Sequence, residues 1–436
     1  MTHPVGILGA GLTGLATASL LARPAVVLES RPWVGGLLRT FGRGGFSSDV
    51  GGHIIFSKDQ RVLDQMLGWL DGQVERGRRS NVILYDKAMV KYPFENGLAE
   101  LPSKQDTLEC VEGFVRAWRE ADTAPVARNL KEWCYRRFGP GISDKYLIPY
   151  NTKIWKLPLE EISTEWVDRV PSPSLTEVLK SAIGIPTEGY THQLYFYYPR
   201  TGGIQRLAEI LRDRALAAGH HIRTGFEVRQ VRRTGDGWLI SDGKETIACE
   251  KLVSTIPILP FMRALDDVPA EVVNAAEQLR TNSLRVVLLG INRPDLNQHT
   301  AVYVPNPRSV YHRVCCNNCF SPWMSPPGCS SVSVEITCSE TDQVGRLDDA
   351  ALVERVVSDL ERDGILRRAD IVESMVHREQ NAYVVYNHGY EQRRTLVADY
   401  ARSREICLAG RVAESKYLNM DACVSRAMEV RAELEG

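Results

Sequence analysis

Residues 5–22 read VGILGAGLTGLATASLLA, and this stretch decides the fold class. An apolar run precedes the pattern Gly9-x-Gly11-x-x-Gly14, and an alanine- and leucine-rich segment follows it. In a strand–turn–helix unit, Gly9 permits the tight turn, Gly11 lets the backbone approach a pyrophosphate, and Gly14 allows close packing of helix on strand. The amides at the helix N-terminus then face the phosphates. The sequence therefore predicts a Rossmann-like dinucleotide-binding domain.

The next apolar segment narrows the choice of cofactor. Residues 25–30, AVVLES, end a predicted strand at Glu29, twenty residues after Gly9. An acid at this place hydrogen-bonds a ribose hydroxyl, which favours FAD or NAD over NADP. Paired glycines, Gly35 and Gly36, follow soon after, and we find no second Gly-x-Gly-x-x-Gly unit. This arrangement is typical of large FAD proteins that resemble amine oxidases and protoporphyrinogen oxidases, so we predict FAD.

The overall composition sets further limits. The chain has 436 residues, of which 44% are hydrophobic and 25% charged, and its net charge is −1. This balance gives no reason to expect nucleic acid or an anionic membrane as a partner. The sequence has no apolar run of membrane-spanning length and enters a predicted strand almost at once. We therefore expect no membrane insertion, no signal peptide and a cytoplasmic protein.

Four of the ten cysteines lie close together, at Cys315, Cys316, Cys319 and Cys329. The spacing Cys316-x-x-Cys319 is that of zinc ligands, and Cys329 could supply a third. A zinc ribbon needs a second well-spaced pair, which is missing. We predict free thiols and no metal, and the role of the cluster stays open.

The rest of the chain alternates between segments of different character. Residues near 102–188 read mostly as helix, whereas residues near 258–400 mix strand-like runs with one long helical segment. The predicted fold is α/β: a Rossmann-like FAD-binding domain with an inserted helical domain and an antiparallel β-sheet domain. The predicted boundaries are 1–90, 191–257 and 401–436 for the FAD domain, 91–190 for the helical substrate-binding insertion, and 258–400 for the sheet.

Six motifs then raise a family resemblance. They are GGHIIFS, VKYPFENGLAELP, YLIPYNTKIWKLPLEEI, VDRVPSP, YYPRTGGIQRL and GRVAESKYLNMD. Their order and spacing resemble those of UDP-galactopyranose mutases, with the first three closer to the eukaryotic-type branch and the last closer to the bacterial branch. The resemblance implies an isomerase that interconverts pyranose and furanose forms of a nucleotide-diphosphate sugar. In that family, reduced flavin N5 attacks the anomeric carbon, the nucleoside diphosphate departs, and there is no net redox.

The resemblance also implies roles for individual residues. His53, Arg169 and Arg313 are placed at the reacting centre, with the arginines on the diphosphate and His53 beside the flavin, not as nucleophile or general base. The expected substrate contacts are Tyr92, Phe94, Glu95, Asn151, Trp155, Gln193, Tyr303, Tyr383 and Tyr417, with Tyr386 as an alternative to Tyr383. The expected cofactor contacts are Gly9, Gly11, Thr13, Gly14, Glu29, Ser30, Gly36, Leu37, Gly52, His53, Val228, Gly410, Arg411, Asn419 and Met420.

We state separate expectations for residues 47–59 and for Glu95. In residues 47–59, SSDVGGHIIFSKD, the apolar Ile54, Ile55 and Phe56 suit a buried strand, and the glycines before them predict close approach of the flavin. Glu95 departs from the glutamine of the eukaryotic-type enzymes. An ionised carboxylate only accepts hydrogen bonds, so the identity of the nucleobase stays open.

Other readings remain at this point. An FAD-dependent amine oxidase or protoporphyrinogen oxidase-like enzyme would share the FAD segments but would not predict YPFEN, PYNTKIW and the two arginines together. A degenerate FAD-binding protein without turnover is a third reading. The sugar, the pathway, the reductant (NAD(P)H or another) and the oligomeric state are left open.

Overall fold

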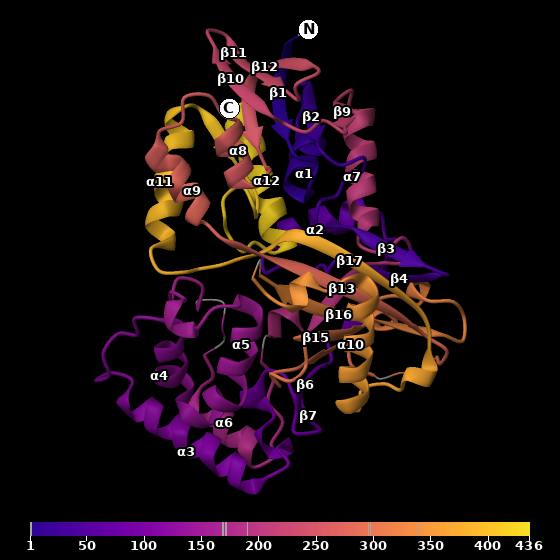
Figure 1. The fold of residues 1–436 in the computed structure, drawn as a ribbon, viewed down its shortest axis with the longest axis vertical. Helices are drawn as coiled ribbons and strands as arrows, with labels where there is room; N and C mark the ends of the chain where they lie inside the picture. The colour runs from indigo at the N-terminus through magenta and orange to yellow at the C-terminus, as the bar shows by residue number, and fades with distance from the viewer. Residues whose placement is uncertain are drawn as a thin grey trace.

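The computed structural model describes residues 2–436 apart from 168, 169, 171, 190, 295, 297, 340 and the side chain of 192. The described chain contains two seven-stranded sheets and two short two-stranded ones. Figure 1 shows the first large sheet in the upper half, the second below it, and the helices α3–α6 beside the second sheet. The predicted combination of a Rossmann-like part, a helical part and an antiparallel sheet is confirmed.

The first sheet is built on β1, which is fully buried at Val5, Ile7 and Leu8. Its strand order is β10-β11-β12-β1-β2-β9. The seventh strand, β18, pairs with the C-terminal end of β12, after the part of β12 that pairs with β11. The pairs β12–β1, β1–β2, β2–β9 and β12–β18 are parallel. The strands are β1 (Thr2–Leu8), β2 (Ala25–Glu29), β9 (His221–Thr224), β10 (Gln230–Thr234), β11 (Gly237–Ser241), β12 (Thr246–Ser254) and β18 (Ile406–Leu408).

Helices from distant parts of the chain cover this sheet. In α1 (Leu12–Leu20), a methyl group at Gly14 would lie 2.1 Å from the carbonyl oxygen of Gly9, so only glycine allows this packing. Figure 1 shows α1 beside α7 and α12. The helices of this part are α2 (Gln60–Trp69), α7 (Gln205–Ala217), α8 (Ile258–Ala264), α9 (Ala270–Gln278), α11 (Tyr390–Ser403) and α12 (Met420–Glu435).

The second sheet has the order β17-β13-β16-β15-β14-β6-β7 and is antiparallel except between β14 and β6. One face packs on α10 (Asp349–Arg362) through a buried aliphatic cluster. The first two strands of this sheet in chain order, β6 and β7, come before the helical segment. The strands are β6 (Asn81–Tyr85), β7 (Ala88–Lys91), β13 (Thr281–Ile291), β14 (Ala301–Tyr303), β15 (Arg313–Cys316), β16 (Ser330–Cys338) and β17 (Ile371–Val384).

The helical part has well-formed helix starts. Ser103, Asn129 and Ser174 each accept a hydrogen bond from a backbone amide of the first turn, as N-cap residues do. The helices are α3 (Lys104–Glu120), α4 (Leu130–Ile142), α5 (Ile148–Trp155) and α6 (Leu175–Ala182). The predicted domain boundaries themselves remain a prediction. None of the described helices combines the length and the apolar composition that a membrane span requires.

The stretch around Gly51 differs from the prediction. The strand β4 (Phe46–Asp49), paired with β3 (Thr40–Arg43), ends before it, and Ile54–Phe56 do not form a strand. Gly51 has φ +88, a conformation that favours glycine and turns the chain out of β4. Ile55 then makes one isolated bridge to Tyr197 of β8 (Tyr195–Pro199), which pairs with β5 (Val74–Arg78). The segment is a loop held at one point.

Candidate active site

Two cavities meet at the loop after Gly51. We call the first the Rossmann cavity; it has a volume of about 590 Å³ and lies at the carboxyl ends of β1 and β2. We call the second the aromatic cavity; it has a volume of about 770 Å³ and lies between the helical part and the second sheet. Eight residues line both cavities: Gly52, Ile54, Phe56, Arg313, Tyr383, Tyr417, Asn419 and Asp421. The two cavities are therefore adjacent at this loop.

The backbone of the Rossmann cavity leaves room for a cofactor. A methyl group added at Gly11 would meet no atom within 4 Å, so it would project into open space. Gly14 does not line the cavity because it packs α1 onto the turn at Gly9. The other predicted cofactor contacts all line it: Gly9, Gly11, Thr13, Glu29, Ser30, Gly36, Leu37, Gly52, His53, Val228, Gly410, Arg411, Asn419 and Met420.

Glu29 stands at the end of β2 with its carboxylate oriented by the backbone. It accepts hydrogen bonds from the amides of Ala10, at 2.8 Å, and Arg31, at 2.9 Å. Arg31 lines the same cavity and makes a bidentate ion pair with Glu379, with N–O distances of 2.9 and 2.7 Å. No local pattern indicates this pair, because its members lie 348 residues apart.

Two polar atoms of the Rossmann cavity lack partners. In the described part of the chain, Nδ1 of His53 and Nε of Arg411 are buried without a hydrogen bond. Burial, and then the charge of Arg411, lowers the pKa of His53 to about 4, so its imidazole is neutral at pH 7. The guanidinium of Arg411 lies 4.1 Å from the ring centroid of Tyr417. Open space over glycine, an acid for a ribose and an arginine for a pyrophosphate together fit FAD.

The aromatic cavity is lined by side chains. Tyr92 stacks on Tyr303, with 4.5 Å between ring centroids, and Tyr150 approaches Tyr303 edge-on at 5.5 Å. Tyr383 and Tyr417 stack at 5.9 Å where the cavities meet. The predicted substrate contacts that line this cavity are Tyr92, Glu95, Asn151, Trp155, Gln193, Tyr303, Tyr383 and Tyr417, and Tyr386 lines it as well.

Phe94 differs from its predicted neighbours. Its side chain is fully buried behind the cavity lining, where it stacks at 5.4 Å on Tyr146, a residue of the lining. It lies in the short turn Phe94–Asn96, where the next residue, Glu95, reaches the cavity instead. Burial raises the pKa of Glu95 to about 7, so this carboxyl changes charge near neutral pH. The structure thus assigns Phe94 to the core.

Arg313 is held at the junction by a buried carboxylate. Its Nε and one terminal nitrogen donate to Glu335 at 2.9 and 2.6 Å, and the amide of Gly52 donates to the same carboxylate at 2.9 Å. Burial alone would raise the pKa of Glu335, but the charges and hydrogen bonds of Arg313 and His312 together outweigh it and hold the pKa well below its usual range. Arg169, the other predicted diphosphate ligand, lies outside the described residues.

Sequence reasoning missed Arg79. It lines the aromatic cavity, donates to the Tyr303 hydroxyl at 3.2 Å and to Gln193, and lies over the ring of Tyr92. In the sequence it belongs to RGRRS, residues 76–80, which looks like an ordinary charged surface run. Only the pairing of β6 with β14 brings it to Tyr303.

The cysteine cluster lies at the end of β15 and beyond it. All ten cysteines are free thiols, and Cys315 is buried with its sulfur 3.6 Å from the carboxylate of Glu335. Within the residues that the structure describes, no group of histidine, cysteine, aspartate and glutamate could hold a metal ion. The absence of a metal remains a prediction.

Comparison with known proteins shows the family to which this chain belongs. The family model of flavin-containing amine oxidoreductases matches residues 12–425, and the chain belongs to that family. A crystal structure of reduced UDP-galactopyranose mutase is similar over 100% of this chain and 96% of that chain, with a TM-score of 0.91 and 25% identity. The predicted resemblance to UDP-galactopyranose mutases is thereby confirmed, and FAD is the cofactor that the family indicates.

More distant structures share the fold alone. A putative protoporphyrinogen oxidase from Exiguobacterium sp. 255-15 is 18% identical, with a TM-score of 0.79, over 100% of this chain and 99% of that chain. Putrescine oxidase bound to putrescine is 16% identical, with a TM-score of 0.67, over 100% and 99%. The fold is therefore common to oxidases and a mutase, and the side chains of the site must decide between them.

Proposed function

We propose that the protein is an FAD-dependent mutase that interconverts the pyranose and furanose forms of a nucleotide-diphosphate sugar. The observation that carries this proposal is the charge of the two cavities. Arg79 in the aromatic cavity and Arg411 in the Rossmann cavity have no carboxylate partner in the described chain, whereas Glu335 neutralises Arg313. Although Asp421 lines both cavities as well, each cavity thus offers an anionic ligand one guanidinium group that no carboxylate neutralises, and this supports a diphosphate as the ligand.

The side chains at the junction suit a departing diphosphate. Arg313 keeps one terminal nitrogen free of Glu335, and the hydroxyls of Tyr303, Tyr383 and Tyr417 are donors on the same lining. Donors fixed in advance stabilise charge that grows on a leaving group without further reorganisation. The residues of the Rossmann cavity would hold FAD, which in its reduced form would supply a nucleophilic ring nitrogen.

The remaining residues orient the ligands. His53 is neutral at pH 7, so it contributes a polar contact to the cofactor rather than a charge. Asn151 accepts from the indole of Trp155 at 3.1 Å and donates to the carbonyl of Leu147 at 2.8 Å, which fixes this end of the cavity. We assign it, with Glu95 and Tyr92, to the nucleobase.

The test is an isomerisation assay in two redox states. The purified flavoprotein is incubated with UDP-galactopyranose, once oxidised and once reduced with dithionite, and the products are separated by chromatography. We expect the furanose form only with the reduced protein. Oxygen consumption with an amine, and no isomerisation of any nucleotide sugar offered, would overturn the proposal in favour of an oxidase.

A further inference from the structure

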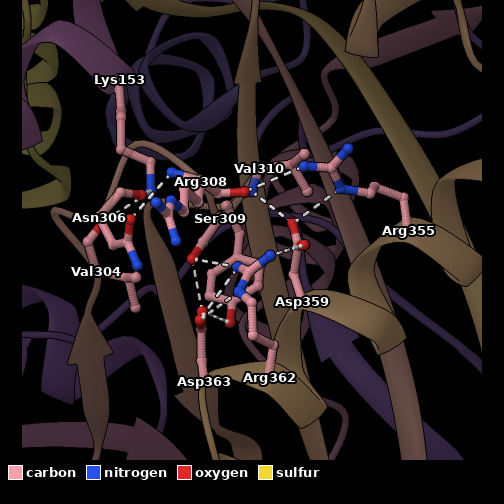
Figure 2. A network of polar contacts seen from close by, with 11 residues as sticks. Lys153, Val304, Asn306, Arg308, Ser309, Val310, Arg355, Asp359, Arg362 and Asp363 are labelled. Atoms are coloured by element: carbon pink, nitrogen blue, oxygen red, sulfur yellow. Dashed lines mark hydrogen bonds and ion pairs between the residues drawn. The ribbon is translucent and has the colours of Figure 1, made fainter. Parts of the chain in front are cut away.

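Lys153 is a partly buried lysine of α5, and desolvation of its ammonium lowers its pKa to about 7. Its neighbours on α5, among them Asn151 and Trp155, line the cavity, but Lys153 does not. Its ammonium donates to the carbonyl oxygens of Val304 at 2.8 Å and Asn306 at 2.9 Å, as Figure 2 shows. Val304 directly follows Tyr303, which lines the same cavity. Lys153 thus connects two walls of the cavity, α5 and the segment that carries Tyr303, which Tyr150 of α5 also contacts edge-on.

The loop that receives Lys153 is itself braced. Residues 304–312 join β14 to β15, and α10 holds them through two aspartates (Figure 2). The amide of Val310 donates to Asp359 at 2.9 Å, and the hydroxyl of Ser309 donates to Asp363 at 2.6 Å. Arg362 pairs with both aspartates, at 2.6 and 3.1 Å. The loop therefore offers Lys153 a fixed partner.

A second side chain holds the same end of α5 on the other side. The amide of Asn282, on β13, donates to the carbonyls of Ile154 at 3.0 Å and Trp155 at 2.8 Å. These bonds satisfy carbonyls at the helix end, which otherwise lack partners. Lys153 differs because burying an ammonium costs free energy that an apolar side chain would not cost. Stability alone does not explain a lysine at this position.

We infer that Lys153 is a positioning residue, which sets the separation between α5 and Tyr303 and thereby the affinity of the aromatic cavity for a nucleotide. This inference rests on the function proposed above. Without the ammonium, two backbone carbonyls lose their donor and α5 is held at its end by Asn282 and by the ion pair of Lys156 with Asp342, at 2.8 Å. Trp155 and Asn151 then lose their fixed distance from Tyr303.

The experiment measures UDP binding by calorimetry and steady-state kinetics for three variants of the holoenzyme. Lys153→Met should weaken UDP binding tenfold or more and raise KM, with kcat changed less than threefold and flavin content unchanged. Lys153→Arg restores a donor and should stay within threefold of wild type. Lys131→Met removes an exposed lysine of the same helical part, paired with Glu160, and serves as the control. Wild-type affinity in Lys153→Met overturns the inference.

Amide hydrogen exchange separates this inference from the proposed function. In Lys153→Met, residues 148–156 and 301–312 should exchange faster, and residues 2–20 should not change. If the wild-type protein binds no UDP, the proposed function fails, and the exchange data still decide whether Lys153 joins the two walls. If the Met variant retains no flavin, Lys153→Gln replaces it in both measurements, with the same two outcomes.

Discussion

The Rossmann cavity and the aromatic cavity share eight lining residues, yet they are built in different ways. The Rossmann cavity is shaped by backbone at the ends of parallel strands, with glycine where the space must stay open. The aromatic cavity is shaped by side chains from the helical part and the second sheet, held by ion pairs and hydrogen bonds such as Arg313–Glu335. The first should therefore respond to added volume, and the second to lost charge.

The largest loss of ligand binding is expected from Gly11→Val. Gly11 has φ −74 and ψ −177, which any residue adopts, and its added atoms would enter open space. The apoprotein should fold normally, but FAD affinity should fall by at least about a hundredfold, or roughly 2.7 kcal/mol. The flavin absorbance per protein measures FAD binding, and the thermal unfolding of the apoprotein measures its folding. Gly68→Val, on the open side of α2, is the control and should keep its flavin. A Gly11→Val protein that retains its flavin would contradict the claim that glycine at this position leaves space for FAD.

Glu335→Ala should be the most destabilising change at the junction. It removes the buried carboxylate that holds Arg313 and the amide of Gly52, and it leaves the partly buried Arg313 unpaired. Breaking a buried pair in this way costs about 3–5 kcal/mol. Urea unfolding of the holoenzyme measures the loss. Glu354→Ala breaks an exposed pair with Arg368 and should leave the midpoint nearly unchanged. Equal midpoints for both variants would contradict the account.

Arg79→Met tests the charge of the aromatic cavity without touching the Rossmann cavity. A charged hydrogen bond contributes about 1.5–3 kcal/mol, so UDP should bind roughly 10- to 100-fold more weakly while FAD stays bound. Arg78→Met, at an exposed arginine paired with Glu188, is the matched control. Calorimetry compares the UDP affinities of the two variants. Equal affinities would show that Arg79 does not contribute to UDP binding.

The smallest effect concerns Glu95. Because its pKa is raised to about 7, the carboxyl is neutral below that pH and charged above it. A charged carboxylate disfavours an anionic nucleotide, so UDP affinity should fall as pH rises from 6 to 8.5, by a factor of about 3–10. Glu95→Gln should lose this part of the pH dependence, and any change that remains belongs to Lys153, whose pKa burial also lowers to about 7. Titrations at four pH values test this, and a parallel pH profile in both proteins would contradict it.

The Rossmann cavity could be predicted from the sequence because its motif is contiguous. Gly9, Gly11 and Glu29 lie within one strand–turn–helix–strand unit, so their spacing alone indicates their place. The residues of the aromatic cavity could be predicted only from the motifs shared with a known family. Arg79 and Tyr303 lie 224 residues apart, and Gly52 and Glu335 lie 283 apart, so no local pattern joins them.

Two expectations differ from the structure for local reasons. The stretch Ile54–Phe56 is apolar enough for a strand, but the positive φ of Gly51 turns the chain away from β4 first. Phe94 and Glu95 are adjacent in a single turn, and sequence cannot tell which of two neighbours faces a cavity. Burial in the fold, rather than residue type, made Phe94 a core residue.

The most direct test of the central claim, that the two cavities form one site, is a titration of the oxidised flavoprotein with UDP. The flavin absorbance spectrum reports a ligand that arrives at the residues shared by both cavities. We predict a saturable spectral change with one UDP per chain, shifted to higher UDP concentration in Arg79→Met. UDP binding that leaves the flavin spectrum unchanged, or no binding at all, would contradict the account.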